Sequence, residues 1–385
     1  MATTAGGSDL DQAQGASPAL GVLRVLGDDG RADPAVDPSL PESVVLRMYR
    51  EMVRVRLLDE KMTALQRQGR IGFYGASTGQ EAAAVAAGMA LSPDDWVVPA
   101  LRESAVMLVR GFPLGAYLAQ VYGNRADVLK GRQMPSHMSS RSVNQVSWSS
   151  CVGSQLPHAV GVAWAARLKG EGTVVIGFLG DGATSAPDFH SAMNMAGVFR
   201  VPVVLVCQNN QYALSCPASR QTASVTIAVK ASAYGIASAR ADGNDVLAVY
   251  RVLSEAIARA RRAEGPTFVE LLTYRLAPHS TSDDPTRYRS EDEVDRWRQR
   301  DPIVRLRRHL SGLGILTDEQ DAEIHREIAE EIARAVGEAE ALGPPDRLSL
   351  FDDVYAEPPW HLVEQRDLLA RTRGRDGSPG EGDGK

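Results

Sequence analysis

Residues 173–182 of the 385-residue chain read TVVIGFLGDG, and residues 201–210 read VPVVLVCQNN. Each stretch begins as a short, nearly continuous apolar run, which is typical of parallel strands covered on both faces. Residues 188–198 lie between them and can form a crossover helix, so the two strands are expected to be parallel neighbours. The turns after Leu179 and Cys207 should then lie at one edge of the sheet, where open α/β sheets bind ligands.

Further helices and strands are expected on both sides of this pair. Apolar residues recur at helical spacing in residues 42–65, 154–169 and 245–262, and residues 267–272 form another strand-like run. Thr317 and Gln320 resemble a capping box before an amphipathic helix. The alternation predicts an α/β fold with a doubly wound, mainly parallel sheet, an N-terminal helical extension and a C-terminal helical region.

Composition predicts where the ordered part of the chain lies. Residues 1–40 are rich in Gly, Ala, Asp, Ser and Pro without a sustained period, which predicts a disordered arm. Residues 41–345 are expected to form the core and residues 346–371 a C-terminal extension. Residues 372–385 are expected to be a disordered tail.

The bulk properties exclude several classes of protein. The net charge of −6 argues against a nucleic-acid surface, which needs a basic excess. The three cysteines Cys151, Cys207 and Cys216 lack metal-ligand spacing and indicate a reducing compartment. No apolar run has transmembrane length, and no basic region precedes an apolar stretch at the N-terminus. A cytoplasmic protein is therefore expected.

Polar residues follow both strands of the central pair. Gly180, Asp181 and Gly182 follow the first, and Asn210 follows the second. Either motif alone is an ordinary turn signal, but together, one crossover unit apart, they are more specific. The Asp181 carboxylate, the Asn210 amide oxygen and the carbonyl oxygen of Tyr212 suit an octahedral magnesium ion, and the glycines allow backbone to approach a diphosphate.

This combination resembles the thiamine-diphosphate enzymes, whose signature is GDG followed by NN at about this distance. Over about residues 42–360 the chain is most similar to the alpha subunits of two-subunit 2-oxoacid dehydrogenases, and among them to the branched-chain type. The resemblance is carried by GRIGFY at 69–74, KGRQMPSH at 130–137, GDGA at 180–183, QNNQYALS at 208–215, DGND at 242–245 and HSTSDD at 279–284.

The resemblance implies a thiamine-diphosphate-binding fold with a defined set of cofactor contacts. The implied ligands of Mg²⁺ are Asp181, Asn210 and the carbonyl of Tyr212. The implied contacts with the cofactor are Arg102, Ser150, Val152, Gly180, Asp181, Gly182, Ala183, Asn210, Tyr212 and His279.

Other roles follow from the same resemblance. His279 and His137 correspond to active-site histidines, and Phe73 corresponds to an aromatic residue of the substrate pocket, although core packing is an alternative for Phe73. Ser280 corresponds to a regulatory phosphorylation position, but without a targeting signal no such regulation is expected. A loop that binds K⁺ in branched-chain relatives corresponds to Ser149, Cys151, Ser154 and Gln155.

The implied reaction is oxidative decarboxylation of 2-oxoacids such as 3-methyl-2-oxobutanoate, with transfer of the acyl group to a lipoyl domain. The glutamate that activates the cofactor lies on a beta subunit in this family, so a heterotetramer of two alpha and two beta subunits and a lipoyl acyltransferase partner are expected. Leu101, Gln208 and Pro278 depart from the family pattern. The first two remove possible phosphate contacts, which suggests weaker cofactor binding.

Three alternatives remain open at this point. A pyruvate or acetoin dehydrogenase alpha subunit would have the same fold and cofactor. A nicotinamide-dependent oxidoreductase would need a glycine fingerprint after its first strand, which the chain lacks. A non-catalytic subunit that only supports its beta partner is favoured by the departures and disfavoured by the retained Asp181, Asn210 and His279.

Overall fold

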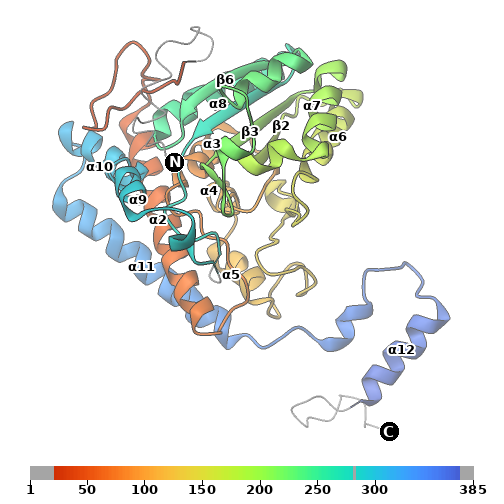
Figure 1. Cartoon of the computed structure of the whole chain (residues 1–385). Coiled ribbons are helices and arrows are strands. Elements are labelled where there is room, and N and C mark those ends of the chain that lie inside the picture. Colours follow the sequence, from red (N-terminus) through yellow and green to blue (C-terminus); the bar gives the residue numbers. More distant parts are fainter. Residues whose placement is uncertain (1–20, 281–282, 373–385) are drawn as a thin grey trace.

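The structure is a computed structural model that describes residues 21–280 and 283–372 (Figure 1). Its centre is a five-stranded sheet in the order β1-β2-β3-β7-β6, in which every neighbouring pair is parallel. A short antiparallel pair, β4 and β5, lies outside it. The strands are β1 (Trp96–Val98), β2 (Val175–Gly180), β3 (Val203–Asn209), β4 (Tyr212–Ala213), β5 (Cys216–Pro217), β6 (Ala237–Asp242) and β7 (Thr267–Leu272).

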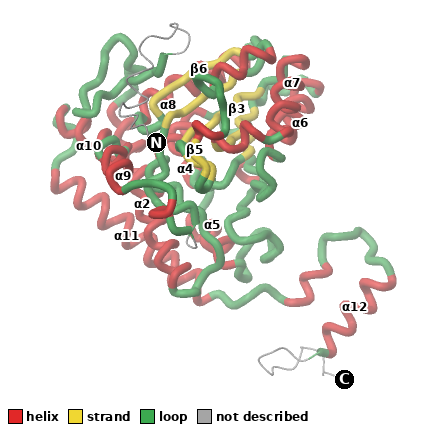
Figure 2. The backbone as a smooth tube through the Cα atoms, in the orientation of Figure 1, coloured by secondary structure: helices red, strands yellow, loops and turns green. Residues whose placement is uncertain are grey.

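Helices cover both faces of the sheet, so the predicted doubly wound α/β fold is confirmed (Figure 2). One face packs on α6 (Gln155–Leu168) and α7 (Pro187–Phe199), and the other packs on α3 (Glu81–Ala90) and α8 (Val246–Arg261). Successive strand residues point to opposite faces, and both faces are buried. The strands therefore read as continuous apolar runs rather than as an alternating pattern.

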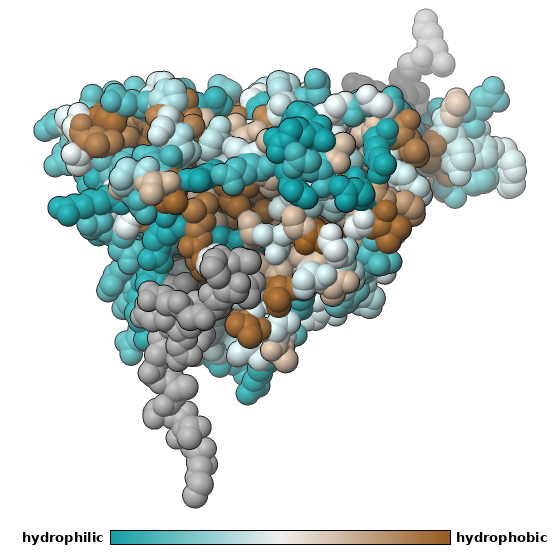
Figure 3. All heavy atoms as spheres, turned by 90° about the horizontal axis from the view of Figure 1, so that it is seen from above, coloured by the Kyte–Doolittle hydropathy of each residue, from teal (hydrophilic) through white to brown (hydrophobic). Residues whose placement is uncertain are grey.

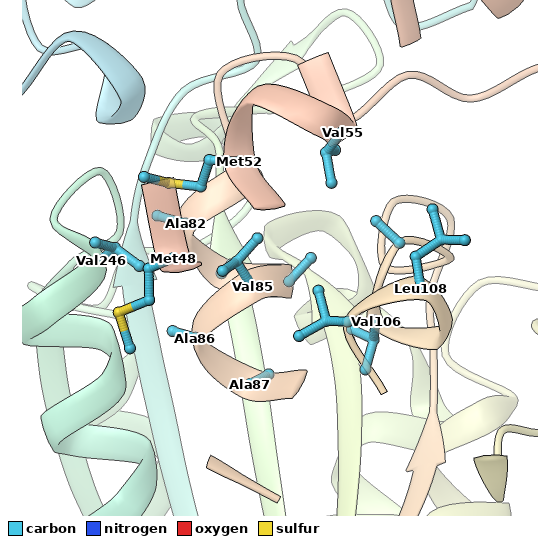
Figure 4. Packing of buried hydrophobic residues seen from close by; sticks show 14 of the residues in the cluster. Met48, Met52, Val55, Ala82, Val85, Ala86, Ala87, Val106, Leu108 and Val246 are labelled. Carbon is cyan, nitrogen blue, oxygen red and sulfur yellow. The ribbon is translucent and has the colours of Figure 1, made fainter. Parts of the chain in front are cut away.

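Additional helices surround this layered core. The long helix α2 (Glu42–Arg67) packs on α3, α10 and α11, and Figure 4 shows Met48 and Met52 of α2 beside Val85 of α3 and Val246 of α8. The capping box predicted at Thr317 starts α11. The remaining α-helices are α4 (Val106–Val109), α5 (Leu114–Tyr122), α9 (Glu291–Arg298), α10 (Pro302–Gly312), α11 (Asp318–Ala341) and α12 (Trp360–Arg371).

Residues 21–40 are not part of a disordered arm, so that part of the prediction for residues 1–40 is wrong. Leu23 donates its backbone N–H to the Arg240 carbonyl oxygen at 2.8 Å, and Val25 and Leu26 are buried in the core. The segment lacks periodicity because scattered apolar residues, backbone hydrogen bonds and the Asp245 carboxylate attach it, without a helix or strand of its own. Residues 1–20 lie outside the described part of the chain.

The C-terminal extension lies away from the sheet. After α11 the chain forms the 3-10 helix η8 (Arg347–Phe351) and then α12, which lies at the lower right of Figure 1, apart from the other helices. Apart from Thr372, the tail expected at residues 372–385 lies outside the described residues.

The surface in Figure 3 is largely hydrophilic with separate hydrophobic patches. Among the described helices, none is long and apolar enough to cross a membrane.

The attachment of residues 21–26 predicts a measurable loss of stability. The buried carboxylate of Asp245 accepts four backbone N–H groups, from Val25, Leu26, Leu247 and Ala248. Asp245→Ala removes a helix cap and leaves buried donors unpaired, which should lower the free energy of unfolding by about 3 kcal/mol. Thermal and urea unfolding would measure this.

The matched control is Asp29→Ala, because the exposed Asp29 side chain makes local contacts with Arg31, accepting its backbone N–H at 3.0 Å and lying 3.6 Å from its Nε. The control should change stability by less than about 0.5 kcal/mol. Equal effects of the two substitutions would contradict the account.

Candidate active site

The two polar turns lie side by side at the carboxyl edge of the sheet. The parallel register sets Gly180 at the end of β2 opposite Gln208 of β3. Asp181 opens the 3-10 helix η4 (Asp181–Ser185), and Asn210 follows β3 directly. A Cβ atom at Gly182 would lie 2.5 Å from the Cβ of Ala213, so the turns touch and only glycine fits at this contact.

The Asp181 carboxylate is buried, and the neutral amide Nε2 of Gln221 donates a hydrogen bond to it at 2.8 Å. Burial raises the pKa of Asp181 to about 6. A cation beside this carboxylate would stabilise its charged form. Within the described residues no group of three His, Cys, Asp or Glu side chains could hold a metal, so an ion here would combine one carboxylate with neutral oxygens. That ligand set suits Mg²⁺.

Hydrogen bonds orient the other two oxygens assigned to the cation. The Nδ2 group of Asn210 donates to Oε1 of Gln80 at 3.1 Å, and Oδ1 of Asn210 accepts the backbone N–H of Tyr212 at 3.3 Å. The carbonyl oxygen of Tyr212 accepts a hydrogen bond from Nη1 of Arg275 at 3.4 Å. The amide oxygen of Asn210 therefore faces the turn that presents the Tyr212 carbonyl.

Two arginines converge on His279 beside these turns. The Nδ1 atom of His279 lies 3.4 Å from Nη2 of Arg102 and 3.3 Å from Nη1 of Arg275. Burial, together with the charges of both arginines, lowers the pKa of His279 to about 4. Burial and the nearby Arg275 charge lower the pKa of Arg102 to about 10. These groups form a cationic corner suited to a phosphate.

Arg275 is the main site residue that the sequence analysis missed. It follows β7 by three positions, at the same edge of the sheet as Asp181 and Asn210, and its side chain is almost fully buried. The sequence contains a signal for Arg275, because the predicted strand at residues 267–272 is followed within three positions by this positively charged residue. Only the fold shows that this arginine reaches His279 and the Tyr212 carbonyl.

A second group of predicted residues gathers on the segment that precedes α6. The ring of His137 stacks on Trp148 with centroids 4.0 Å apart, and its Nε2 lies 2.9 Å from Oγ of Ser150. The neighbouring Ser136 donates through Oγ to the carbonyl oxygen of Phe73 at 3.0 Å. His137 and Ser150 are thus in contact, and the backbone of Phe73 is bonded to the residue that precedes His137.

The loop at residues 149–155 borders the Asp181 turn. A Cβ atom at Gly153, which has φ +91°, would lie 3.0 Å from the Cβ of Ala186 and 4.0 Å from the carbonyl oxygen of Ala183. This contact places Ser150 and Val152 near η4. Val152 is 66% exposed, so the described chain leaves most of this residue uncovered.

The same loop contains the residues assigned to a potassium site. Oγ of Ser154 donates to the Cys151 carbonyl oxygen at 2.8 Å, and the Cys151 N–H donates to Oγ of Ser149 at 3.2 Å. The Gln155 amide donates to the Phe178 carbonyl oxygen at 3.0 Å, while its buried Oε1 has no hydrogen-bond partner. The potassium site stays a prediction.

Two of the three departures from the family pattern, Gln208 and Leu101, are accommodated in the fold. The amide of Gln208 donates to the buried carboxylate of Glu103, and burial raises the pKa of Glu103 to about 7. The Leu101 side chain lies against Gly75, where an added Cβ atom would be 2.7 Å from Cδ1. The weaker cofactor binding inferred from Leu101 and Gln208 stays a hypothesis.

The cationic corner predicts that His279 is neutral at pH 7. In ¹⁵N NMR of the histidine-labelled protein, its imidazole should titrate with a midpoint near pH 4, because burial and two positive charges disfavour the imidazolium form. Arg102→Met removes one of those charges and should raise the midpoint toward the ordinary value of about 6.5. A midpoint near 6.5 in the unmodified protein would contradict the geometry.

Comparison with known proteins identifies the family of the chain. Residues 49–347 match the family model described as the dehydrogenase E1 component. The 2-oxoisovalerate dehydrogenase subunit alpha of Pseudomonas aeruginosa is 41% identical over 368 residues, covering 94% of this chain and 90% of that protein. The mitochondrial alpha subunit of Bos taurus is 41% identical over 352 residues, covering 91% and 77%. The mitochondrial alpha 1 subunit of Arabidopsis thaliana is 40% identical over 362 residues, covering 93% and 77%. The chain belongs to the dehydrogenase E1 component family.

Proposed function

We propose that this chain is the alpha subunit of a branched-chain 2-oxoacid dehydrogenase, which decarboxylates 3-methyl-2-oxobutanoate and related 2-oxoacids and transfers the acyl group to a lipoyl domain. Family membership implies thiamine diphosphate as the cofactor and a beta subunit as partner. The observation that carries the proposal is the contact between the Asp181 and Asn210 turns beside the arginines that converge on His279.

The site supports binding of a metal–diphosphate group. Asp181, Asn210 and the carbonyl of Tyr212 offer the hard oxygen ligands that Mg²⁺ prefers, and the guanidinium of Arg102 would face the diphosphate. When bound, thiamine diphosphate supplies the nucleophilic carbon that attacks the keto group and the electron sink that makes loss of CO₂ possible. The chain itself binds and orients the reacting groups.

The tautomer of His279 follows from its neighbours. A guanidinium group can only donate hydrogen bonds, so Nδ1 of His279 must accept from Arg102 and Arg275. The neutral ring therefore carries its proton on Nε2. His279 can donate that N–H to an anionic ligand without adding a charge to the corner.

His137 has the opposite arrangement. Its Nδ1 lies 2.9 Å from the carbonyl oxygen of Pro135, which can only accept, so Nδ1 carries the proton. Its Nε2 then accepts the Ser150 hydroxyl proton. With Phe73 nearby, His137 and Ser150 would form a polar edge beside an aromatic wall of the substrate pocket.

The C-terminal extension supports assembly with the beta subunit into a heterotetramer that serves a lipoyl acyltransferase. No residue of α12 is buried, and Trp360 is 77% exposed. Lys130 and Arg132 form ion pairs with Asp353 that hold the start of the extension near the core. Large exposed apolar side chains on a projecting helix mark an interaction surface. The beta subunit is its proposed occupant.

The activity is tested by co-expression with the cognate beta subunit. The complex should decarboxylate 3-methyl-2-oxobutanoate with a higher kcat/KM than pyruvate, and the isolated chain should be inactive. Asp181→Asn removes the charged ligand and should lower kcat/KM at least about 100-fold in the complex. A preference for pyruvate would favour the pyruvate dehydrogenase alternative, and no magnesium-dependent binding of thiamine diphosphate would favour a non-catalytic subunit.

The role of the extension is tested by ending the chain after residue 345. The shortened chain should keep its core, because η8 and α12 contribute no buried residue, but it should lose affinity for the beta subunit. Size-exclusion chromatography over a concentration series would detect dissociation. As a control, Val198→Ser changes a 67% exposed apolar residue on the distant helix α7. Unchanged assembly of the shortened chain would contradict the assignment.

A further inference from the structure

The buried carboxylate of Glu270, on β7, joins three segments beneath the candidate site. Its Oε1 accepts a hydrogen bond from Nδ2 of Asn209 at 2.9 Å. Its Oε2 accepts the backbone N–H of Ala228 at 2.9 Å and Nε of Arg240 at 3.1 Å. The Glu270 side chain is only 1% exposed, so a ligand that enters the site from solvent cannot touch it. It can act only through the residues it holds.

The first connection leads to the Asn210 turn. Oδ1 of Asn209 accepts the backbone N–H of Gln211 at 3.3 Å, and Gln211 has φ +74°, a conformation that residues other than glycine rarely adopt. Gln211 lies between Asn210 and Tyr212, both assigned to the cation. Glu270 fixes which end of the Asn209 amide faces Gln211, and so it holds the unusual backbone of the turn.

The second connection leads to the Asp181 turn. Ala228 begins the 3-10 helix η6 (Ala228–Tyr234), and two residues later Nζ of Lys230 donates to Oγ1 of Thr184 at 3.1 Å. Oγ1 of Thr184 in turn donates to the carbonyl oxygen of Asp181 at 2.7 Å. A single carboxylate is therefore linked to both turns that carry the assigned ligands, through hydrogen bonds and, on the second path, through the short backbone segment from Ala228 to Lys230.

We propose that Glu270 is a positioning residue that holds the Asp181 and Asn210 turns at the separation needed for one cation to bind both. This inference rests on the proposed function, since it assumes that a cation and thiamine diphosphate bind at these turns. It adds a role for a residue that contacts neither. Groups that orient metal ligands from behind change metal affinity by about 10–100-fold when they are removed.

The substitution Glu270→Gln tests the connection with nearly the same side-chain volume. The Oε1 atom of the new side chain can still accept hydrogen bonds from Ala228 and Arg240. Its Nε2 atom then faces Nδ2 of Asn209, and because both groups are donors, no hydrogen bond forms between them. If the Asn209 amide rotates to relieve this, its Nδ2 faces the Gln211 N–H instead. Turning the amide at position 270 itself would instead take the acceptor oxygen away from Ala228 and Arg240. Each orientation therefore weakens one of the two connections, so we expect the Mg²⁺ concentration for half-maximal binding of thiamine diphosphate to rise about tenfold or more.

The double substitution Glu270→Gln with Asn209→Asp should restore binding. The carboxylate introduced at position 209 would accept from both the new side-chain amide at position 270 and the Gln211 N–H, and the pair keeps one carboxylate in the cluster that includes Arg240. Half-saturating Mg²⁺ should return to within about threefold of the unmodified protein. General destabilisation would not be reversed by adding a second buried substitution.

The matched control is Asp95→Asn. Asp95 is equally buried, pairs with Arg261 at 2.7 Å and accepts the Val174 N–H at 2.9 Å, but it lies just before β1, at the opposite edge of the sheet. It should lower thermal stability without changing the magnesium requirement. Should Glu270→Gln fail to assemble, Lys230→Met cuts the second connection at a half-buried side chain, and it should raise half-saturating Mg²⁺ about threefold.

All measurements use the complex with the cognate beta subunit and follow binding of thiamine diphosphate by tryptophan fluorescence during magnesium titration. No magnesium-dependent binding in the unmodified complex would overturn the proposed function itself. If the unmodified complex binds normally, three results would overturn only the role of Glu270. They are an unchanged half-saturating Mg²⁺ concentration in Glu270→Gln, no recovery in the double variant, and an equal rise in Asp95→Asn. An unshifted Lys230→Met would do the same where Glu270→Gln does not assemble.

Discussion

The candidate site depends on buried ionisable groups whose charges the chain compensates only in part. Burial raises the pKa of Asp181 and lowers the pKa of Arg102 and His279, so in each case the environment disfavours the charged form. The carboxylate needs a neighbouring cation, and the arginines need a neighbouring anion. A metal ion bound to a diphosphate supplies both in one ligand, which explains why a site of opposite, separated charges can exist at one sheet edge.

The sheet makes this arrangement possible because it is parallel and covered on both faces. Parallel strands β2, β3 and β7 all end at the same edge, so Asp181, Asn210 and Arg275 reach one region although they are far apart in the sequence. The covered faces exclude water from beneath that edge, which strengthens hydrogen bonds such as those made by Glu270 and Glu103. Function at the edge and apolar packing in the strands are thus two consequences of one topology.

Much of the fold and the main ligand turns could be predicted from the sequence, because both depend on local patterns. The continuous apolar runs of β2 and β3 and the polar residues after them identify Asp181 and Asn210. The edge strand β6, which reads ASARAD, was missed because half of its residues are polar, and its place beside β7 depends on long-range pairing. The attachment of residues 21–26 and the reach of Arg275 were missed for the same reason: they depend on contacts between distant segments, which no local period records.

The surface around the site gives a physical reason why the reaction should need a second subunit. Three apolar residues lie around the site. The Met134 carbonyl accepts the His137 N–H, Val152 lies in the loop beside η4, and the Leu214 carbonyl accepts a hydrogen bond from Arg275. These residues are nevertheless 63%, 66% and 48% exposed, respectively. Loss of CO₂ is favoured where water is kept from the reacting groups, and the described chain leaves these three apolar side chains exposed beside its buried polar residues. A partner surface that buries these three side chains would stabilise the assembly through apolar contact and close the site in the same step. Binding of the partner and catalytic competence are therefore expected to be inseparable in this protein.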